Sequence, residues 1–159
     1  MKKLTLVLVS TLLLSLTGLP AAVHAGSTLP DDRFALKGLK QTRAIFDVRL
    51  ADLDKLLFNL GLIKETWEGM SAQKVKPTMI ISLRGPAVRL FTKEQAVPEL
   101  KELLTDLKQK GIRIEICSVA TRIFKVDNAQ LLPDLVLVGN VLTSQIAWQN
   151  KGYALITLN

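Results

Sequence analysis

The chain has 159 residues, 48% of them hydrophobic, which suits one domain with a substantial apolar core. Its formal charge is +7, but Lys and Arg are spread along the sequence without a dense block, which argues against a nucleic-acid-binding protein. The sequence contains one Cys, so an internal disulfide and a CxxC pair are both excluded.

The first 25 residues have the three parts of a secretory signal peptide. Lys2 and Lys3 form a basic start, residues 4–19 are almost wholly apolar, and Val23 and Ala25 suit the small-residue positions of a signal peptidase site. We therefore predict cleavage after Ala25 and a periplasmic mature chain. The apolar run is shorter than the roughly 20 residues that cross a bilayer, so no membrane span is expected after cleavage. A retained N-terminal anchor is the alternative.

Cleavage at this point would remove His24, the one histidine of the sequence. A chain without histidine has no Ser-His-Asp or Cys-His catalysis and no histidine-based zinc or copper site. We expect no metal site and no cofactor. The groups left for chemistry are carboxylates, lysines and a single thiol.

Residues 26–41 are polar and are predicted to form an N-terminal arm or linker, followed by one domain over residues 42–159. The first strand is predicted at 44–48. A helix follows over 51–67, where apolar residues recur on one helical face. A continuous apolar run predicts a second strand at 78–82 that is covered on both faces, and the segment RGPAV then interrupts it.

The clearest helix begins at Pro98, a first-turn position where the missing N–H costs nothing, and ends at Gly111 as its C′ residue. Alternation over 112–116 predicts a third strand with one polar side, away from the centre of the sheet. A short helix from Ser118, a fourth strand at 135–138, a helix over 141–149 and a fifth strand at 153–158 complete the chain. Five strands separated by helices indicate an α/β sandwich with a parallel sheet.

Ligands of open parallel sheets bind at the carboxyl ends of the strands. The residues predicted there are Asp47, Arg84, Gly85, Cys117, Ser118, Gly139 and Asn140. Asp47 suits a general base, but an Asp at a strand end is more typical as a cap of the next turn. Arg84 and Gly85 suit an anion-binding turn, and an ordinary loop with a solvated arginine is the alternative. Neither RGPAV nor VGNV matches a nucleotide-binding motif.

Cys117 is the candidate nucleophile. A cysteine between a strand and a helix lies at the positive end of that helix, and Arg84 and Arg122 are expected nearby, all of which favour the reactive thiolate. On this interpretation the thiol opens onto solvent at the edge of the sheet. The alternative is a buried free cysteine that behaves as a small hydrophobic residue. Trp148 and Tyr153 are interpreted as packing or subunit contacts.

Four segments resemble DsrE/DsrF-like proteins, in the order seen in that family. They are IFDVRLADLDKLLFNLGLI, MIISLRGPAVRLF, LKQKGIRIEICSVAT and VLVGNVLTSQIAWQNKGYALITL, spread over residues 42–158. The resemblance implies a three-layer α/β/α fold with a five-stranded parallel sheet, and assembly into homo- or hetero-oligomers. Some members relay sulfur as a cysteine persulfide, and Cys117 matches the position of that cysteine. In well-known carriers an Arg-Gly pair follows the cysteine, whereas TRIFKV here provides Arg122 without the glycine.

The leading hypothesis is a periplasmic sulfur carrier of sulfurtransferase type that uses Cys117 as its persulfide site. Its partners would be a sulfur donor or acceptor protein and further copies of itself. The residues expected to hold an anionic donor or line the cleft are Arg84, Gly85, Ser118, Arg122 and Asn140. The alternative is a non-catalytic oligomeric module that binds a small anion or an exported protein. No motif supports a hydrolase or phosphotransferase.

Overall fold

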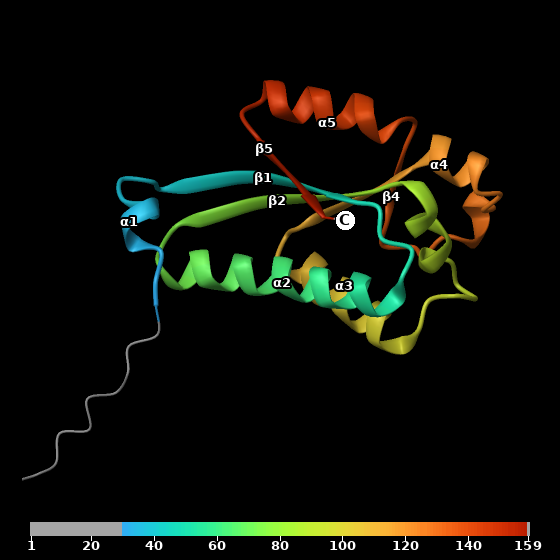
Figure 1. Ribbon diagram of the computed structural model, residues 1–159, viewed down its shortest axis with the longest axis horizontal. Coiled ribbons are helices and arrows are strands. Elements are labelled where there is room, and N and C mark those ends of the chain that lie inside the picture. The colour runs from blue at the N-terminus through green and yellow to red at the C-terminus, as the bar shows by residue number, and fades with distance from the viewer. Residues whose placement is uncertain (1–29, 159) are drawn as a thin grey trace, which may run out of the picture. The chain divides into compact units, whose positions relative to one another are not determined.

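The computed structural model describes residues 30–158, and the elements below lie in the unit from Asp32 to Asn159 (Figure 1). The strands are β1 (Gln41–Val48), β2 (Lys76–Leu83), β3 (Arg113–Cys117), β4 (Val136–Val138) and β5 (Ala154–Leu158). The helices are α1 (Arg33–Leu36), α2 (Leu53–Ala72), α3 (Pro98–Gln109), α4 (Ser118–Ile123) and α5 (Val141–Asn150), with 3₁₀ helices η1 (Gly85–Phe91) and η2 (Asn128–Gln130). The strands form one parallel sheet in the order β4-β3-β2-β1-β5. The predicted five-stranded parallel α/β fold is therefore confirmed.

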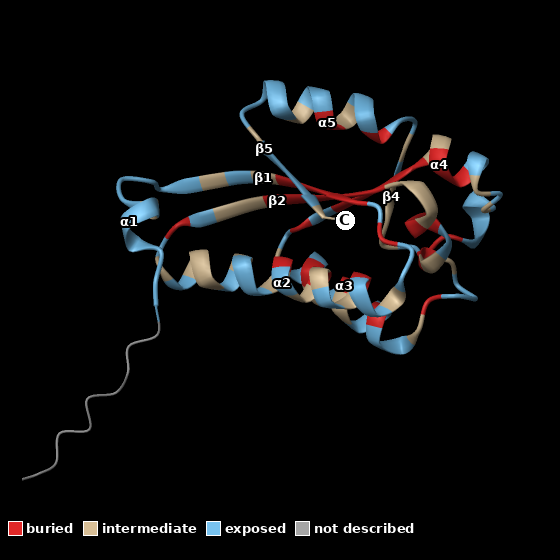
Figure 2. Cartoon of the chain, viewed as in Figure 1, coloured by how far each residue is buried: buried red, intermediate tan, exposed pale blue. Residues whose placement is uncertain are grey.

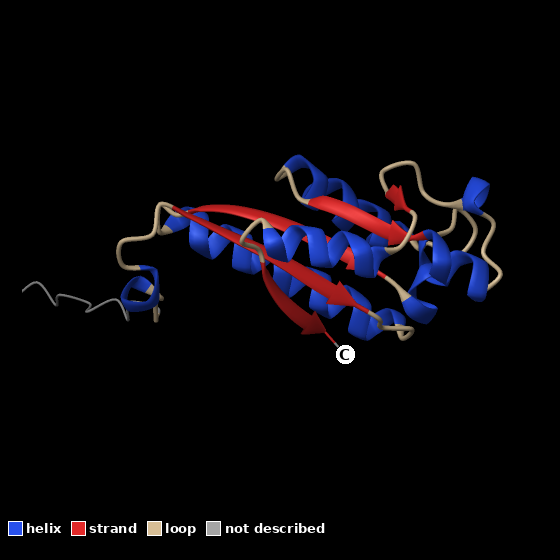
Figure 3. Cartoon of the chain, turned by 90° about the horizontal axis from the view of Figure 1, so that it is seen from above, coloured by secondary structure: helices blue, strands red, loops and turns tan. Residues whose placement is uncertain are grey.

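The helices cover the two faces of the sheet unequally. Helices α2 and α3 lie side by side against one face, and α5 lies across the other (Figures 1 and 3). Strands β1 to β4 follow one another in one direction across the sheet, while β5 lies on the far side of β1. Because parallel crossovers share one hand, the connection that returns to β5 passes over the opposite face. The result is a three-layer arrangement.

Local sequence signals account for most element boundaries. Helix α3 begins at Pro98, and Gly111 follows its end with φ of +77°, as predicted for a C′ glycine. Helix α2 begins after Asp52, whose carboxylate accepts a hydrogen bond from the Lys55 backbone N–H. Strand β1 begins at Gln41, three residues before the predicted start, because its polar first residues still pair with β2.

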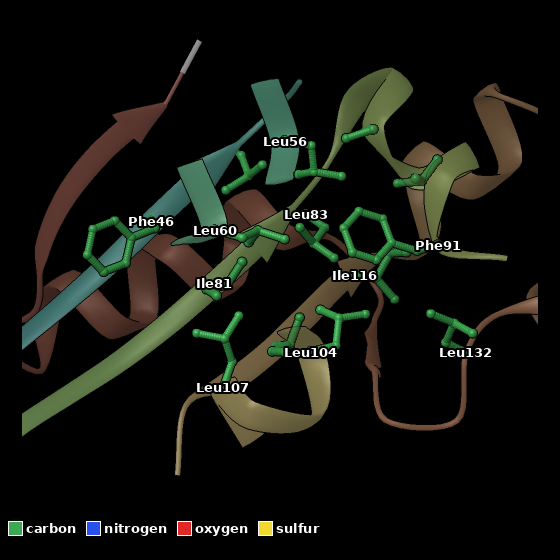
Figure 4. Packing of buried hydrophobic residues seen from close by; sticks show 14 of the residues in the cluster. Phe46, Leu56, Leu60, Ile81, Leu83, Phe91, Leu104, Leu107, Ile116 and Leu132 are labelled. Carbon is green, nitrogen blue, oxygen red and sulfur yellow. The ribbon is translucent and has the colours of Figure 1, made fainter. Parts of the chain in front are cut away.

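The apolar core lies between the sheet and α2, α3 and η1 (Figure 4). Alternate residues of β1, β2 and β3 point toward these helices, as the period of two requires. The buried residues labelled in Figure 4 include Phe46, Leu60, Ile81, Leu83, Phe91, Leu104 and Ile116. The red segments of Figure 2 run along the middle of the sheet, whereas α5 and β5 are mostly exposed.

The central strand is β2, flanked on both sides, in agreement with its continuous apolar run. Strand β3 lies one position from the centre, as its alternation indicated. Its polar side does not face solvent, however, because Glu115 is 1% exposed beneath α5. Within residues 30–158, no helix is both long and apolar enough to cross a bilayer.

Candidate functional site at the carboxyl edge of the sheet

The carboxyl ends of four adjacent strands bring most of the predicted site residues to one edge. Asp47 is near the end of β1, Arg84 follows β2, Cys117 ends β3 and Asn140 follows β4. Helix α5 begins at the same edge, directly after Asn140. The edge is therefore assembled from residues that are distant in sequence, as expected for a parallel sheet.

Cys117 is buried, with 4% of its surface exposed, so the expectation that its thiol opens onto solvent is wrong. Its sulfur Sγ lies 3.4 Å from the backbone nitrogen of Val141 and accepts that N–H. Val141 is the first residue of α5 and is itself fully buried. The start of α5 therefore covers the sulfur. The sequence suggested that the thiol would meet the N-terminus of α4, but it contacts the N-terminus of α5 instead.

The contact with α5 has a chemical consequence for the sulfur. The first N–H groups of a helix have no partner within the helix, and they form the positive end of its dipole. An acceptor placed there is favoured when it carries negative charge. Asn140 completes the same helix end, since its side-chain oxygen accepts the Leu142 N–H at 3.0 Å. Asn140 thus caps α5 through its side-chain oxygen.

The Arg84 guanidinium is held by Asp47 through two hydrogen bonds, from Nε to Oδ1 at 2.7 Å and from Nη2 to Oδ2 at 2.8 Å. Gln145 of α5 donates a third hydrogen bond to Asp47 Oδ1 at 3.0 Å. Burial alone raises the pKa of Asp47, but the hydrogen bonds from Arg84 and Gln145 and the charges of Arg84 and Arg49 outweigh it and hold this pKa below its usual value. Asp47 therefore neither caps a turn nor stands ready as a base.

Arg84 lies within electrostatic reach of the sulfur. The hydrogen bond to Asp47 is the main cause of its raised pKa, partly offset by burial, and electrostatic interactions with Asp47 and Cys117 add to it. A basic group is therefore near Cys117, as the sequence predicted. Because Asp47 balances the charge of Arg84, the field that reaches the sulfur is weaker than that of a free arginine.

Three donors of the expected anion-binding turn at Arg84 and Gly85 are already in use. The Arg84 backbone N–H donates to the Val48 carbonyl at 3.1 Å, and the guanidinium is bound to Asp47. Gly85 has φ of +63°, a conformation that favours glycine, and it begins η1. Gly85 thus allows the backbone to turn sharply after β2.

Two further predicted residues belong to α4. Ser118 is its first residue, half-buried, and its carbonyl accepts a hydrogen bond from the Thr121 hydroxyl at 2.9 Å. Arg122 lies near the other end of α4 and is exposed. Among residues 30–158 no hydrogen bond or ion pair joins Arg122 to Cys117. Ser118 directly follows the sulfur-bearing residue, whereas Arg122 is exposed near the other end of α4.

A row of three buried polar side chains lies under α5, and two of the three, Ser82 and Glu115, were not among the predicted site residues. Asp47, Ser82 and Glu115 are neighbours in register on β1, β2 and β3, and each is at most 3% exposed. Their shared parity places them on the face that α5 covers. The signal was present in the sequence, because each of the three predicted strands carries at least one polar residue on this parity. We call Asp47, Ser82 and Glu115 the polar row.

Helix α5 is attached to this row by hydrogen bonds. Glu115 accepts from the Ser144 hydroxyl at 2.5 Å and from the Trp148 indole at 3.2 Å, and it also accepts from Arg113 Nε at 2.7 Å. Trp148 packs beside Tyr153 with ring centroids 5.1 Å apart, which agrees with the packing role expected for both. The Ser82 hydroxyl is buried without a hydrogen-bond partner in the structure.

Other features of the described part of the chain do not involve the predicted site residues. A surface hollow of ≈ 370 Å³ is bordered by η1 and the segment after α4, and none of the six predicted site residues lines it. Within residues 30–158, no group of three or more His, Cys, Asp or Glu side chains is arranged to hold a metal ion. His24 and the predicted cleavage site lie outside the described residues.

The parallel α/β fold, with a cysteine at the carboxyl end of its third strand, can be compared with known protein families. The model of the DsrE/DsrF-like family matches residues 54–158, and the chain belongs to this family. No curated protein matches the sequence.

Two solved structures share the fold. MTH1491 from Methanobacterium thermoautotrophicum, described as a protein of unknown function, has a TM-score of 0.62 and 17% identity, over 73% of this chain and 98% of its own. The ychN protein from E. coli has a TM-score of 0.59 and 17% identity, also over 73% of this chain and 98% of its own. At this level of identity the likeness concerns the fold alone.

Proposed function

We propose that this protein is an exported sulfur carrier of the DsrE type that holds sulfane sulfur on Cys117 as a persulfide. The observation that carries the proposal is the position of Cys117 Sγ at the carboxyl edge of the sheet, in contact with the first N–H of α5. Membership of a family that includes sulfur-relay proteins supports the same role. Arg84 lies close enough to add positive potential.

The proposed transfer needs no external oxidant or reductant. The Cys117 thiolate attacks the outer sulfur of a donor persulfide, R–S–SH, and a new S–S bond forms to Cys117. The S–S bond of the donor breaks, and the donor leaves as its thiolate with the electron pair. An acceptor thiolate then attacks the outer sulfur on Cys117, which returns Cys117 to the thiolate and leaves a persulfide on the acceptor.

Access to the buried sulfur requires local opening of the structure. Of the α5 residues, only Val141 and Gln145 are buried, and the contacts of α5 with the polar row are hydrogen bonds. Segments with few buried apolar contacts open at a lower free energy than the core. Displacement of the first turn of α5 would expose the sulfur while the apolar core stays intact.

The test of the carrier role is the mass of the intact protein. We expect protein treated with polysulfide to gain the mass of one sulfur atom, to lose it on treatment with dithiothreitol, and to transfer it to a small thiol acceptor. The Cys117→Ser variant should show none of these changes. A wild-type protein that takes up no sulfur while folded would contradict the proposal.

The test of access uses Gln145→Ala, which removes the hydrogen bond from α5 to Asp47. Loss of a hydrogen bond to a charged group should raise the population of the open form, and with it the alkylation rate of Cys117, about tenfold. The matched control is Gln109→Ala at the exposed end of α3, which should leave the rate unchanged. Equal rates in the two variants would show that α5 does not govern access.

Export is tested separately. The basic start, the apolar run and the small residues before Gly26 support a periplasmic location after cleavage. We expect the protein in the periplasmic fraction, with a mass that begins at Gly26. A chain that retains Met1 and stays with the membrane would favour the anchored alternative.

A second candidate function is a non-catalytic module that binds a small anion or an exported protein. The burial of Cys117 and the commitment of Arg84 to Asp47 favour it, because both reduce the reactivity expected of the edge. On this alternative Cys117→Ser retains full function in the cell. Loss of function in that variant, with its circular dichroism spectrum unchanged, would exclude this role.

A further inference from the structure

We infer that the end of the domain opposite Cys117 binds the surface of an anionic phospholipid bilayer. This end holds α1 and the first residues of β1, β2 and β5, and we call it the amino end (Figure 1). The inference goes beyond the proposed function, because it does not depend on sulfur chemistry at Cys117. It rests on exposed apolar side chains, on basic side chains without carboxylate partners, and on where the N-terminal segment joins the domain.

The apolar side chains of the amino end belong to α1 and the turn after it. Phe34 in α1 is 93% exposed, and Leu39, just before β1, is 48% exposed. No residue of α1 is buried, so packing within the domain does not account for Phe34. Aromatic side chains are enriched at membrane interfaces, and binding there combines burial of apolar groups with attraction of neighbouring cations to anionic lipids.

Basic residues that are spread along the sequence gather at this end of the fold. Six of them are exposed there, namely Lys37, Lys40, Arg43, Lys74, Lys76 and Lys151. The Lys76 backbone N–H donates to the Lys40 carbonyl at 3.0 Å, and Arg43 Nη1 donates to the Lys151 carbonyl at 3.0 Å. The starts of β1, β2 and β5 therefore lie side by side, and they present their cations on one surface next to α1.

These six cations have no carboxylate partner among residues 30–158. By contrast, Lys64, Lys108 and Lys110, on or next to α2 and α3, are each paired with an Asp or Glu side chain. Asp31 and Asp32 precede α1 and offset part of the charge, but a positive excess remains. Each Lys or Arg close to an anionic lipid surface strengthens binding roughly fivefold.

Lys74 occupies a position where the backbone favours glycine. Helices α2, α3 and α5 end in the same pattern of backbone hydrogen bonds, and the residue after each C-cap has a positive φ. That residue is Gly111 after α3 and Gly152 after α5, but it is Lys74, with φ of +64°, after α2. A side chain in this conformation costs stability relative to glycine. Contact of the Lys74 ammonium with lipid phosphates would compensate for that cost.

The N-terminal segment joins the domain at the same end, where the Asp32 backbone N–H donates to Gln73 Oε1 after α2. Residues 20–31 separate the apolar run of 4–19 from Asp32, and a chain of that length spans at most about 40 Å. Whenever the apolar run lies in a bilayer, before cleavage or in the anchored alternative, the amino end stays close to that bilayer. This proximity selects a bilayer as the occupant, rather than a nucleic acid or an acidic protein.

The orientation that follows suits a carrier. Because the strands are parallel, a sheet whose amino ends meet the membrane has its carboxyl ends directed away from it. Cys117 at the end of β3 would then face soluble partners.

The test is co-sedimentation of the exported protein with vesicles of phosphatidylglycerol and phosphatidylcholine, and with vesicles of phosphatidylcholine alone. We expect binding to the anionic vesicles that weakens as the salt concentration rises. Phe34→Ser should lower the partition coefficient roughly tenfold. The double variant Lys40→Gln with Lys76→Gln should lower it roughly 25-fold.

Matched control variants carry the same substitutions away from the amino end. Phe58→Ser replaces a phenylalanine of α2 that is 67% exposed. Lys55→Gln with Lys101→Gln removes the same charge from exposed positions in the first turns of α2 and α3. Both controls should change the partition coefficient by less than about twofold.

Lys74→Gly separates a role in binding from a role in the fold. It should raise the Tm by about 2–4 °C while weakening vesicle binding about fivefold. A variant that is more stable and binds the vesicles as well as the wild type would show that the Lys74 side chain does not contact lipid.

Lysine labelling keeps the test decisive if the protein retains residues 4–19 and sediments with every vesicle. Acetylation read by mass spectrometry should be slowed at Lys40 and Lys76 on anionic vesicles, and unchanged at Lys55 and Lys101. Uniform labelling, a wild type without residues 4–19 that binds neither vesicle, equal losses in the control variants, or tighter binding to an oligonucleotide than to the vesicles would each overturn the inference.

Discussion

The face of the sheet beneath α2 and α3 is packed with apolar side chains, whereas the face beneath α5 carries the polar row. On the first face, burial of apolar surface supplies the stabilising free energy. On the second, desolvation of Asp47 and Glu115 is costly and is offset by hydrogen bonds from Arg84, Gln145 and Ser144. The comparison teaches that one face holds the domain together while the other fixes where α5 lies.

The largest expected effect is on the apolar face. Leu60→Ala in α2 removes a fully buried side chain and should lower the free energy of unfolding by about 3 kcal/mol. Leu62→Ala on the same helix, where the residue is 42% exposed, should lower it by less than about 1 kcal/mol. Urea denaturation measures both, and equal losses would mean that this face is not the source of stability.

A smaller loss of unfolding free energy is expected for Arg84, which binds Asp47 of the polar row. Arg84→Ala leaves the Asp47 carboxylate buried with its main partner gone and should cost about 2 kcal/mol, since the arginine side chain is itself 26% exposed. Arg122→Ala on the exposed end of α4 is the control and should change stability by less than about 0.5 kcal/mol. An Arg84→Ala variant as stable as the wild type would show that water, rather than the arginine, stabilises the Asp47 carboxylate.

The same pair predicts a dependence on pH that the apolar face does not share. The pKa of Asp47 is lower in the folded protein than its ordinary value of about 3.9, so the folded state favours the carboxylate. Its contribution to stability is complete above that ordinary value and is lost as the pH falls through the folded value. The difference in unfolding free energy between wild type and Asp47→Asn should therefore narrow below about pH 4. A difference that stays constant down to pH 2 would contradict this assignment.

The smallest effect has the opposite sign. Ser82→Ala removes a hydroxyl that is buried without a partner and should raise the free energy of unfolding by up to about 1 kcal/mol. Ser144→Ala, the same substitution on α5, removes a donor to Glu115 and should lower it by about 1–2 kcal/mol. Destabilisation by Ser82→Ala would indicate an ordered water on that hydroxyl.

The fold could be predicted from the sequence because its signals are local. Pro98 and Gly111 mark the ends of α3, and alternation before Cys117 marks β3. The contacts of the site are not local. Arg84 meets Asp47 across 37 residues and Gln145 meets Asp47 across 98, and no periodicity specifies such pairs.

The position of Cys117 at the carboxyl edge followed from the predicted end of the third strand, but the burial of its side chain could not be predicted in this way. The alternation in the sequence placed the cysteine at the end of β3, and we expected the thiol to be exposed to solvent there. Burial depends on where α5 crosses the sheet, which is set by hydrogen bonds to polar residues that a hydrophobic pattern ignores. The polar row was visible only as three single residues in three separate strands.

The cover over Cys117 also sets a timescale. A reactive atom enclosed by a helix end can meet a reagent only during the intervals when that end is displaced. At high reagent concentration the modification rate of Cys117 then stops rising and equals the opening rate of α5. The opening of the helix end would therefore limit the reaction rate. Between openings the sulfur is shielded from oxidants, and a reduced thiol can persist in surroundings where an exposed one would be consumed.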